Sequence, residues 1–108
     1  MTRRDASYRS DHPGPTAVQR LPGRVLLDFG TDWCGHCVAA RAAVDAWVAA
    51  HPGTAHLRVE DGPGRPLGRA FRVKLWPTLV LLHDGQEKAR VVRPRAADDL
   101  RPLQVGPD

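Results

Sequence analysis

Residues Val25 to Val38, with the sequence VLLDFGTDWCGHCV, carry the strongest structural pattern of this chain. The first part of this stretch is a continuous apolar run interrupted by Asp28, which is typical of a strand that is covered on both faces. A short loop follows, and from about Cys34 to Ala50 the chain is rich in alanine, with apolar residues at helical spacing. The stretch therefore predicts a buried strand that leads through a loop into a helix.

The two cysteines of the chain lie at the start of that predicted helix. The unpaired N–H groups and the partial positive charge of a helix N-terminus stabilise a thiolate at Cys34, and the thiolate is the nucleophilic form of cysteine. Cys37 follows one helical turn later, close enough to close a small disulfide. His36 is a positive neighbour that favours the thiolate over the disulfide and makes the pair a stronger oxidant. The pattern predicts redox chemistry at the two sulfurs, with neither a metal nor an organic cofactor.

The rest of the chain predicts a mixed α/β domain. Short helices are expected at 15–21, 66–71 and 95–103, and further strands at 55–60, 78–82 and 88–92. The dipeptide Asp84-Gly85 predicts a tight hairpin turn. Residues 1–14 lack periodicity and are expected to form a flexible N-terminal tail, so that residues 15–108 make a single domain. We expect a central mixed sheet of four strands, with a fifth allowed, flanked by helices.

Composition and charge narrow the classes of function. The 108 residues include 16 Lys+Arg and 12 Asp+Glu, a net charge of +4 that is scattered along the sequence. A scattered charge with few aromatic residues does not predict a nucleic-acid interface. No apolar run is long enough to span a membrane, and no apolar leader follows the first residues. We therefore expect a cytoplasmic protein, and its size suggests a monomer.

Four motifs occur in an order and spacing that resembles the thioredoxin superfamily, over roughly residues 24–103. They are VLLDF at 25–29, WCGHC at 33–37, WPTL at 76–79 and DG at 84–85. The resemblance implies a thioredoxin-like fold and thiol–disulfide oxidoreductase activity. The tetrapeptide Cys-Gly-His-Cys is similar to that of protein disulfide isomerase domains, whereas thioredoxins usually carry proline in place of His36.

The resemblance also implies roles for the site residues. Cys34 is the attacking cysteine and Cys37 the resolving one, while His36 tunes the thiolate. Asp28 matches a buried acid that takes the proton of the resolving thiol. Pro77 matches a proline that follows a cis peptide bond. The residues expected to contact the client are Trp33, Gly35, Trp76, Pro77 and Arg93, and Trp33 is expected to cover the cysteine pair.

Five positions depart from the usual thioredoxin pattern. Gly30 stands where thioredoxins usually have a tryptophan, and Arg93 where they often have a glycine that faces the client. Trp76 replaces a small or branched residue before the proline, and Ala42 replaces a proline that kinks the helix. His56 lies near the position of a lysine that partners the buried acid.

The expected partners are client proteins that contain a disulfide or a dithiol, with a thioredoxin reductase or glutathione as the electron donor. Two other functions are compatible with part of the pattern. One is a thioredoxin-fold binding or chaperone module whose cysteines are incidental. The other is a zinc module in which Cys34 and Cys37 join two histidines. Zinc is disfavoured because there is no second CxxC motif and because the helix would have to unwind to present both sulfurs.

Overall fold

The computed structural model describes residues 7–103. In chain order the elements are α1 (Pro15–Gln19), β1 (Arg24–Gly30), α2 (Gly35–Ala50), β2 (Thr54–Glu60), α3 (Pro66–Ala70), β3 (Thr78–His83), β4 (Gln86–Val92) and the 3₁₀ helix η1 (Ala97–Leu100). Each agrees in type with an expected helix or strand, and most boundaries agree within two residues.

Within the described residues, the four strands form one mixed sheet in the order β2-β1-β3-β4. β1 is parallel to β2 and antiparallel to β3, and β3 is antiparallel to β4. The turn between β3 and β4 contains Asp84 and Gly85, which both have positive φ angles, 52° and 83°. The hairpin expected from this dipeptide is therefore confirmed. β1 is central in the sheet, which explains why its sequence is apolar on both faces.

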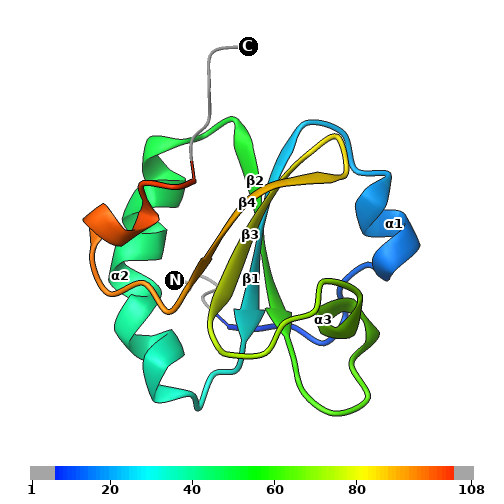
Figure 1. Ribbon diagram of the computed structural model, residues 1–108, viewed down its shortest axis with the longest axis horizontal. Coiled ribbons are helices and arrows are strands. Elements are labelled where there is room, and N and C mark those ends of the chain that lie inside the picture. Colours follow the sequence, from blue (N-terminus) through cyan, green and yellow to red (C-terminus); the bar gives the residue numbers. More distant parts are fainter. Residues whose placement is uncertain (1–6, 104–108) are drawn as a thin grey trace, which may run out of the picture.

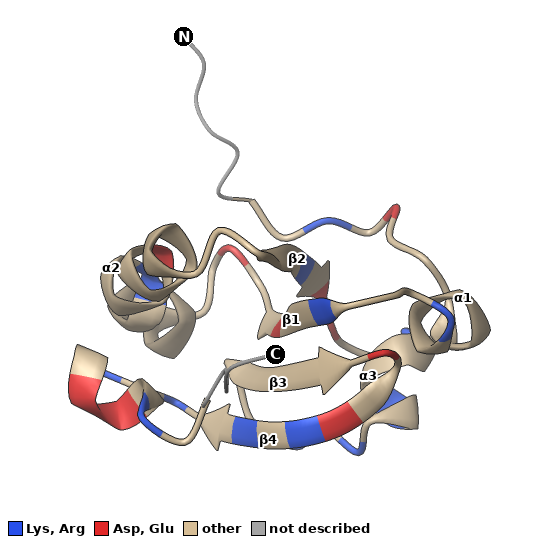
Figure 2. Cartoon of the chain, turned by 90° about the horizontal axis from the view of Figure 1, so that it is seen from above, with Lys and Arg blue, Asp and Glu red and all other residues tan. Residues whose placement is uncertain are grey.

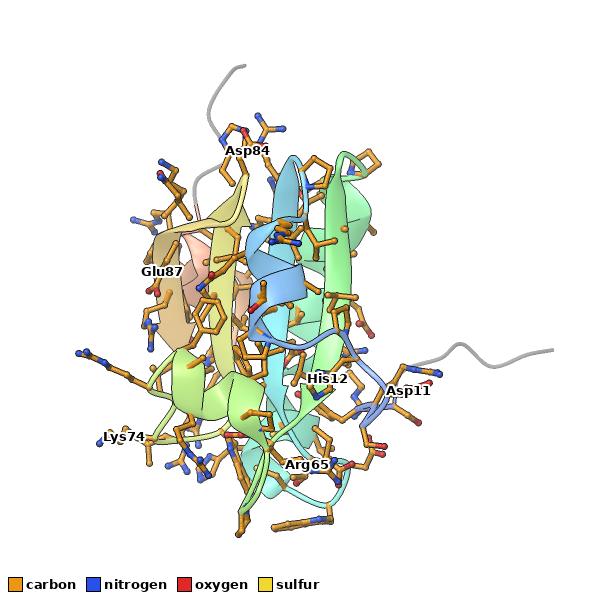
Figure 3. All side chains as sticks on the ribbon, turned by 90° about the vertical axis from the view of Figure 1, so that its right-hand side faces the viewer. Asp11, His12, Arg65, Lys74, Asp84 and Glu87 are labelled. Atoms are coloured by element: carbon orange, nitrogen blue, oxygen red, sulfur yellow. The ribbon has the colours of Figure 1, made fainter. Side chains whose placement is uncertain are left out.

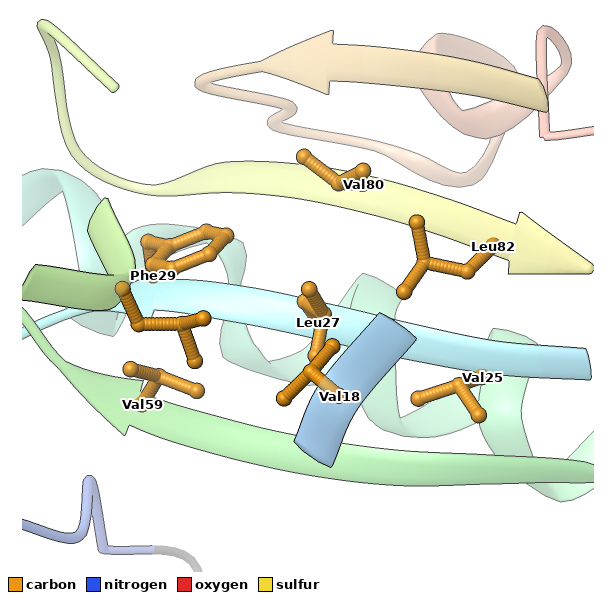
Figure 4. Close-up of a cluster of buried hydrophobic side chains, with 8 residues drawn as sticks. Val18, Val25, Leu27, Phe29, Val59, Val80 and Leu82 are labelled. Atoms are coloured by element: carbon orange, nitrogen blue, oxygen red, sulfur yellow. The ribbon is translucent and has the colours of Figure 1, made fainter. Parts of the chain in front are cut away.

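Helices cover both faces of the sheet (Figure 1). α2 and η1 pack on one face, and α1 and α3 lie on the other. On the second face, Val18 of α1 lies over Val25 and Leu27 of β1 (Figure 4). Each such fully buried aliphatic side chain stabilises the fold by about 1.5–3 kcal/mol relative to exposure. The two layers hold β1 rigidly, and the site described below lies at the carboxyl end of this strand.

The N-terminal segment differs from the expectation of a flexible tail up to residue 14. Tyr8 is buried, and Arg9 forms a parallel bridge with Val59 of β2. The backbone N–H of Arg9 donates to Arg58 O (3.0 Å), and the N–H of Glu60 donates to Arg9 O (2.9 Å). Pairing with the outer edge of β2 and burial of one aromatic ring hold this segment in place, so the prediction was wrong for the residues around Tyr8. Residues 1–6 lie outside the described residues.

The C-terminal helix is shorter than expected. In place of a helix over 95–103, the structure has the single 3₁₀ turn of η1. Leu100 and Leu103 are buried, whereas Ala96 is exposed. Pro102 lacks a backbone N–H and cannot continue a helical hydrogen-bond ladder, which explains the early end.

Charged residues of both signs are interspersed over the elements rather than gathered by sign on one face (Figure 2). Strand β4, for example, carries lysine and arginine next to glutamate. Within residues 7–103, no helix combines the length and the apolarity needed to cross a lipid bilayer.

Candidate active site

Cys34 is the N-cap residue of α2. Its backbone is extended (φ −81°, ψ 122°), and its Sγ accepts the backbone N–H of Cys37 at 3.4 Å. A sulfur in this position faces the unpaired N–H groups of the first helical turn, which stabilise a negative charge. Cys34 is 8% exposed and Cys37 is 2% exposed. Cys34 is therefore the sulfur that a disulfide of another molecule reaches first.

Cys37 lies behind Cys34 and has an unfavourable environment for its thiolate. Burial, with a smaller contribution from the neighbouring Cys34, raises the pKa of Cys37 to about 12, although the Thr31 backbone and the Tyr8 hydroxyl act in the opposite direction. Near neutral pH such a thiol is almost entirely protonated, and the protonated form is a poor nucleophile. Attack by Cys37 therefore requires a group that accepts its proton.

Asp28 of β1 is joined to the cysteine cluster through Tyr8, and its environment differs from the apolar one that the sequence suggested. Its side chain is 2% exposed and contacts three polar groups. Tyr8 Oη donates to Asp28 Oδ1 at 2.6 Å, and Arg58 Nε donates to Asp28 Oδ2 at 3.2 Å. His56 Nε2 lies 3.8 Å from Asp28 Oδ2. The carboxyl thus belongs to a buried polar network, in which each bond strengthens the others.

The parallel register of β1 and β2 places Arg58 directly opposite Asp28. Burial alone would lower the pKa of Arg58, but the carboxylates of Asp28 and Asp45 outweigh burial and raise it. The Arg58 Nη2 group donates to Asp45 of α2 at 2.9 Å. The guanidinium therefore stays charged and links the sheet to the helix that carries the cysteines.

The two tryptophans that were expected to contact the client differ in their position relative to the cysteine pair. The peptide bond between Trp76 and Pro77 is cis. Trp76 packs against the cluster of Tyr8, Cys34 and Cys37, and its Nε1 donates to Asp61 at 2.8 Å. Trp33 is 77% exposed and meets Trp76 edge to face, with ring centroids 5.7 Å apart. Trp76, rather than Trp33, is therefore the tryptophan packed against the cysteine cluster.

Arg93 lies on the same side and contacts the backbone next to the cis bond. Its Nε donates to Trp76 O at 2.8 Å, and its N–H donates to Pro77 O at 2.8 Å. Its φ of 54° lies in the region that glycine adopts most easily. Gly35 and His36 are exposed on the first turn of α2. Among residues 7–103, no group of three or more His, Cys, Asp or Glu side chains is placed to hold a metal ion.

Two residues of the site, Tyr8 and Arg58, were not identified from the sequence. Tyr8 lies in a segment without periodicity, and the one signal that concerned it was indirect: Gly30 leaves space beside the cysteines that another side chain must fill. Arg58 lies in an expected strand, but its pairing with Asp28 depends on the strand register. A charged residue near the middle of a half-buried strand was the available signal.

Comparisons with known proteins agree with this geometry. The family model described as thioredoxin matches residues 15–103. Thioredoxin 2 from Pseudomonas aeruginosa PAO1, solved in its reduced form, is 52% identical with a TM-score of 0.80, and the match covers 90% of each chain. Thioredoxin from Chlamydia trachomatis serovar D is 37% identical over 79 residues, 72% of this chain and 76% of its own. Protein disulfide-isomerase A3 of Gallus gallus is 29% identical over 97 residues, 89% of this chain but 19% of its own.

The fold and the cysteine pair define a thiol–disulfide oxidoreductase with a thioredoxin-like α/β fold. The chain belongs to the thioredoxin family, and Cys34 and Cys37 are its CxxC pair.

The buried resolving thiol predicts how the stability of the reduced protein depends on pH. In the unfolded chain the Cys37 thiol ionises near its ordinary value of 9.0, whereas in the folded chain its pKa is about 12. The unfolded state therefore releases this proton first as the pH rises, and the folded state loses stability from about pH 9 towards about pH 12. The contribution is fully present below pH 9. Tyr8, whose pKa is also raised by burial and by Asp28, adds a loss of the same sign.

Urea unfolding of the reduced protein at a series of alkaline pH values measures this effect. The urea midpoint of the parent should fall more steeply above about pH 9 than that of a Cys37→Ala variant. Equal slopes for the two proteins would show that the folded state does not hold the proton of Cys37.

Proposed function

We propose that this protein reduces disulfide bonds of client proteins in the cytoplasm, and that a thioredoxin reductase or glutathione renews its thiols. One observation carries the proposal: the more accessible Cys34 caps a helix directly in front of a deeply buried Cys37, whose proton has an acceptor network at Asp28. This arrangement suits a reaction in which one sulfur attacks and the other resolves.

The reaction divides into two exchanges of sulfur partners. The Cys34 thiolate attacks one sulfur of the client disulfide, a bond to that sulfur forms, and the other client sulfur leaves as a thiolate. Cys37 then loses its proton and attacks the Cys34 sulfur. The Cys34/Cys37 disulfide forms, the bond to the client breaks, and the second client sulfur leaves with the electron pair. The client gains two electrons, and the protein is oxidised by the same two electrons.

The surface around Cys34 suggests the character of the client. The large hydrophobic side chains that are exposed within residues 7–103 are Trp33, Val38, Leu75 and Val92. Next to Trp76 lies an open pocket of about 300 Å³ whose rim includes Arg65, Arg69 and Lys74. Arg65 and Lys74 are labelled in Figure 3. Arg93 adds a further positive charge at the Trp76 carbonyl. An extended segment with an apolar side chain and an acidic neighbour beside its cysteine complements this surface.

A pair of disulfide-containing peptides that differ by Glu or Lys beside the cysteine tests the proposal. The reduced protein should reduce both, and it should favour the acidic peptide. Arg93→Ala should weaken that preference by about two- to fivefold, the size of one exposed ion pair. Arg72→Ala is the matched control, because Arg72 is also exposed and also has a positive φ, 57°, whereas it is Arg93 whose side chain donates to the Trp76 carbonyl. Equal effects of the two variants would contradict a role of Arg93 in client selection, and reduction of neither peptide would contradict the proposed function.

We further propose that His36 gives the pair the more oxidising character of a disulfide-isomerase-type Cys-Gly-His-Cys motif. The similarity to a stretch of protein disulfide-isomerase A3 supports this assignment. His36→Pro should lower the reduction potential of the pair by roughly 30 mV, which corresponds to a tenfold change in the equilibrium with glutathione. Equilibration of both proteins with glutathione buffers measures the shift. An unchanged or higher potential in the variant would contradict the role of His36.

A further inference from the structure

Tyr8 reaches the resolving cysteine from outside the expected domain. It is 7% exposed, and it forms one buried cluster with Cys34 and Cys37. Its backbone N–H donates to Asp32 Oδ1 at 3.0 Å, and the next residue, Arg9, pairs with the edge of β2. The hydroxyl group is therefore held in a fixed position between the helix that carries the cysteines and the strand that carries the acid.

Gly30 makes the space that the Tyr8 ring occupies. A Cβ atom on Gly30 would overlap Cys37 Sγ and would lie 2.9 Å from both Cζ and Oη of Tyr8. The sulfur and the hydroxyl thus converge on the same face of Gly30, within one buried cluster. On its other side, the same hydroxyl donates to Asp28 at 2.6 Å. Tyr8 Oη therefore lies beside the thiol and is hydrogen-bonded to the carboxylate.

We propose that Tyr8 is a catalytic residue that relays the proton of Cys37 to Asp28 when the mixed disulfide is resolved. Cys37 gives its proton to Tyr8 Oη while Tyr8 gives its own proton to the Asp28 carboxylate. The Cys37 sulfur attacks Cys34 in the same step, and the client sulfur leaves with the electron pair. The protein thus holds one proton on Asp28 and no charge on Tyr8. The relay rests on the proposed two-step exchange at the cysteines.

Charged groups surround the network on the side of Asp28. Arg58 Nε donates to Asp28 Oδ2 at 3.2 Å, and Asp45 on α2 shares that guanidinium. Burial and the neighbouring Asp28 raise the pKa of Tyr8, so its hydroxyl stays neutral and passes a proton on without forming a free phenolate. Within residues 7–103, His56 is a further titratable group that faces Asp28, with its Nε2 at 3.8 Å from Asp28 Oδ2.

His56 also supplies the exit for the proton, next to the charged Arg58. Both contact Asp28, and both line a cavity of about 190 Å³ between the N-terminal segment and β2. The cavity is bordered by Asp11 and His12, which are labelled in Figure 3. The His56 Nε2 atom is buried and has no hydrogen-bond partner among the described residues, so it is free to exchange the proton of Asp28. Asp28 can therefore return to the carboxylate form through this side without involving the client.

Reaction with Ellman's reagent separates attack from resolution in one experiment. Cys34 attacks the reagent and releases a first coloured thiolate, and Cys37 then attacks the mixed disulfide and releases a second. Tyr8→Phe keeps the ring and removes the hydroxyl. It should leave the first phase unchanged and slow the second phase at neutral pH by at least about tenfold, and the slowed phase should recover as the pH rises.

A double-mutant cycle distinguishes a relay from simple packing. In an Asp28→Asn background the acceptor is absent, so adding Tyr8→Phe should slow the second phase little further. Val18→Ala is the control for lost stability, because Val18 packs in the core on the opposite face of the sheet and should leave both phases at the parent rates. Equal slowing of both phases by Tyr8→Phe, or the same slowing in the Asp28→Asn background, would overturn the relay.

A proton inventory on the unmodified protein tests the relay without any substitution. The relay moves two protons in the same step, so the second-phase rate should depend on the fraction of heavy water along a curve. A linear dependence would overturn the relay. A failure of the proposed function would differ from a failure of the relay. If the two-step exchange did not occur, the parent protein would release no second thiolate at all.

Discussion

Replacing Cys34 with alanine is expected to abolish disulfide reduction, with a fall in rate on the order of 10⁴-fold or more. Cys34 is the N-cap of α2, where the first-turn N–H groups stabilise its thiolate, and it is the less buried sulfur of the pair. Cys37, with a pKa of about 12 and 2% exposure, cannot replace it as the attacking group. The rate is measured by the reduction of a disulfide-containing peptide by the reduced protein.

The stability of the Cys34→Ala variant shows whether a loss of activity comes from a loss of fold. The side chain of Cys34 is small, and its loss removes one weak contact to the Cys37 N–H at 3.4 Å, so the urea midpoint should stay close to that of the parent. A Cys34→Ala protein that is folded and still reduces the peptide at more than a few per cent of the parent rate would contradict the assignment of Cys34 as the nucleophile.

Replacing Cys37 with serine is expected to stop turnover at the mixed disulfide. Attack by Cys34 should keep most of its rate, because Cys34 and the helix N-terminus are unchanged. Resolution should be lost, since serine at this position is a far weaker nucleophile than a thiolate. Mass spectrometry of the variant after mixing with a disulfide peptide should therefore show the protein with one half of the peptide attached, and added dithiothreitol should release it.

The same adduct distinguishes the order of the two cysteines. In the parent it should be short-lived, because Cys37 resolves it within the pair. Accumulation of the adduct in Cys34→Ala rather than in the Cys37→Ser variant would reverse the assigned roles. Absence of an adduct in both variants would contradict attack through a mixed disulfide.

The central part of the fold could be predicted because its signals are local. The apolar run of β1 and the alanine-rich pattern of α2 carry the correct periodicities, and Asp84-Gly85 supplies the turn between β3 and β4. These patterns place Cys34 at a helix N-terminus without any knowledge of tertiary structure. The catalytic pair was therefore visible in the sequence together with its local environment.

The surroundings of the pair could not be predicted, because they depend on contacts between distant segments. Tyr8 lies 20 residues before Asp28, and no local pattern joins them. Arg58 meets Asp28 only through the parallel register of β1 and β2, where a shift by one residue would turn its side chain to the other face. The sequence does not show which of Trp33 and Trp76 contacts the cysteines, because that depends on how the loop after α3 packs.

The redox activity of the Cys34/Cys37 pair is tested by equilibrating the protein with glutathione buffers of increasing oxidised fraction, with the thiols trapped and counted at each point. We expect a single two-electron transition from two thiols to a Cys34/Cys37 disulfide, at a potential between roughly −270 and −120 mV. Two thiols that remain reduced throughout, or that form glutathione adducts without ever joining to each other, would contradict a redox-active pair.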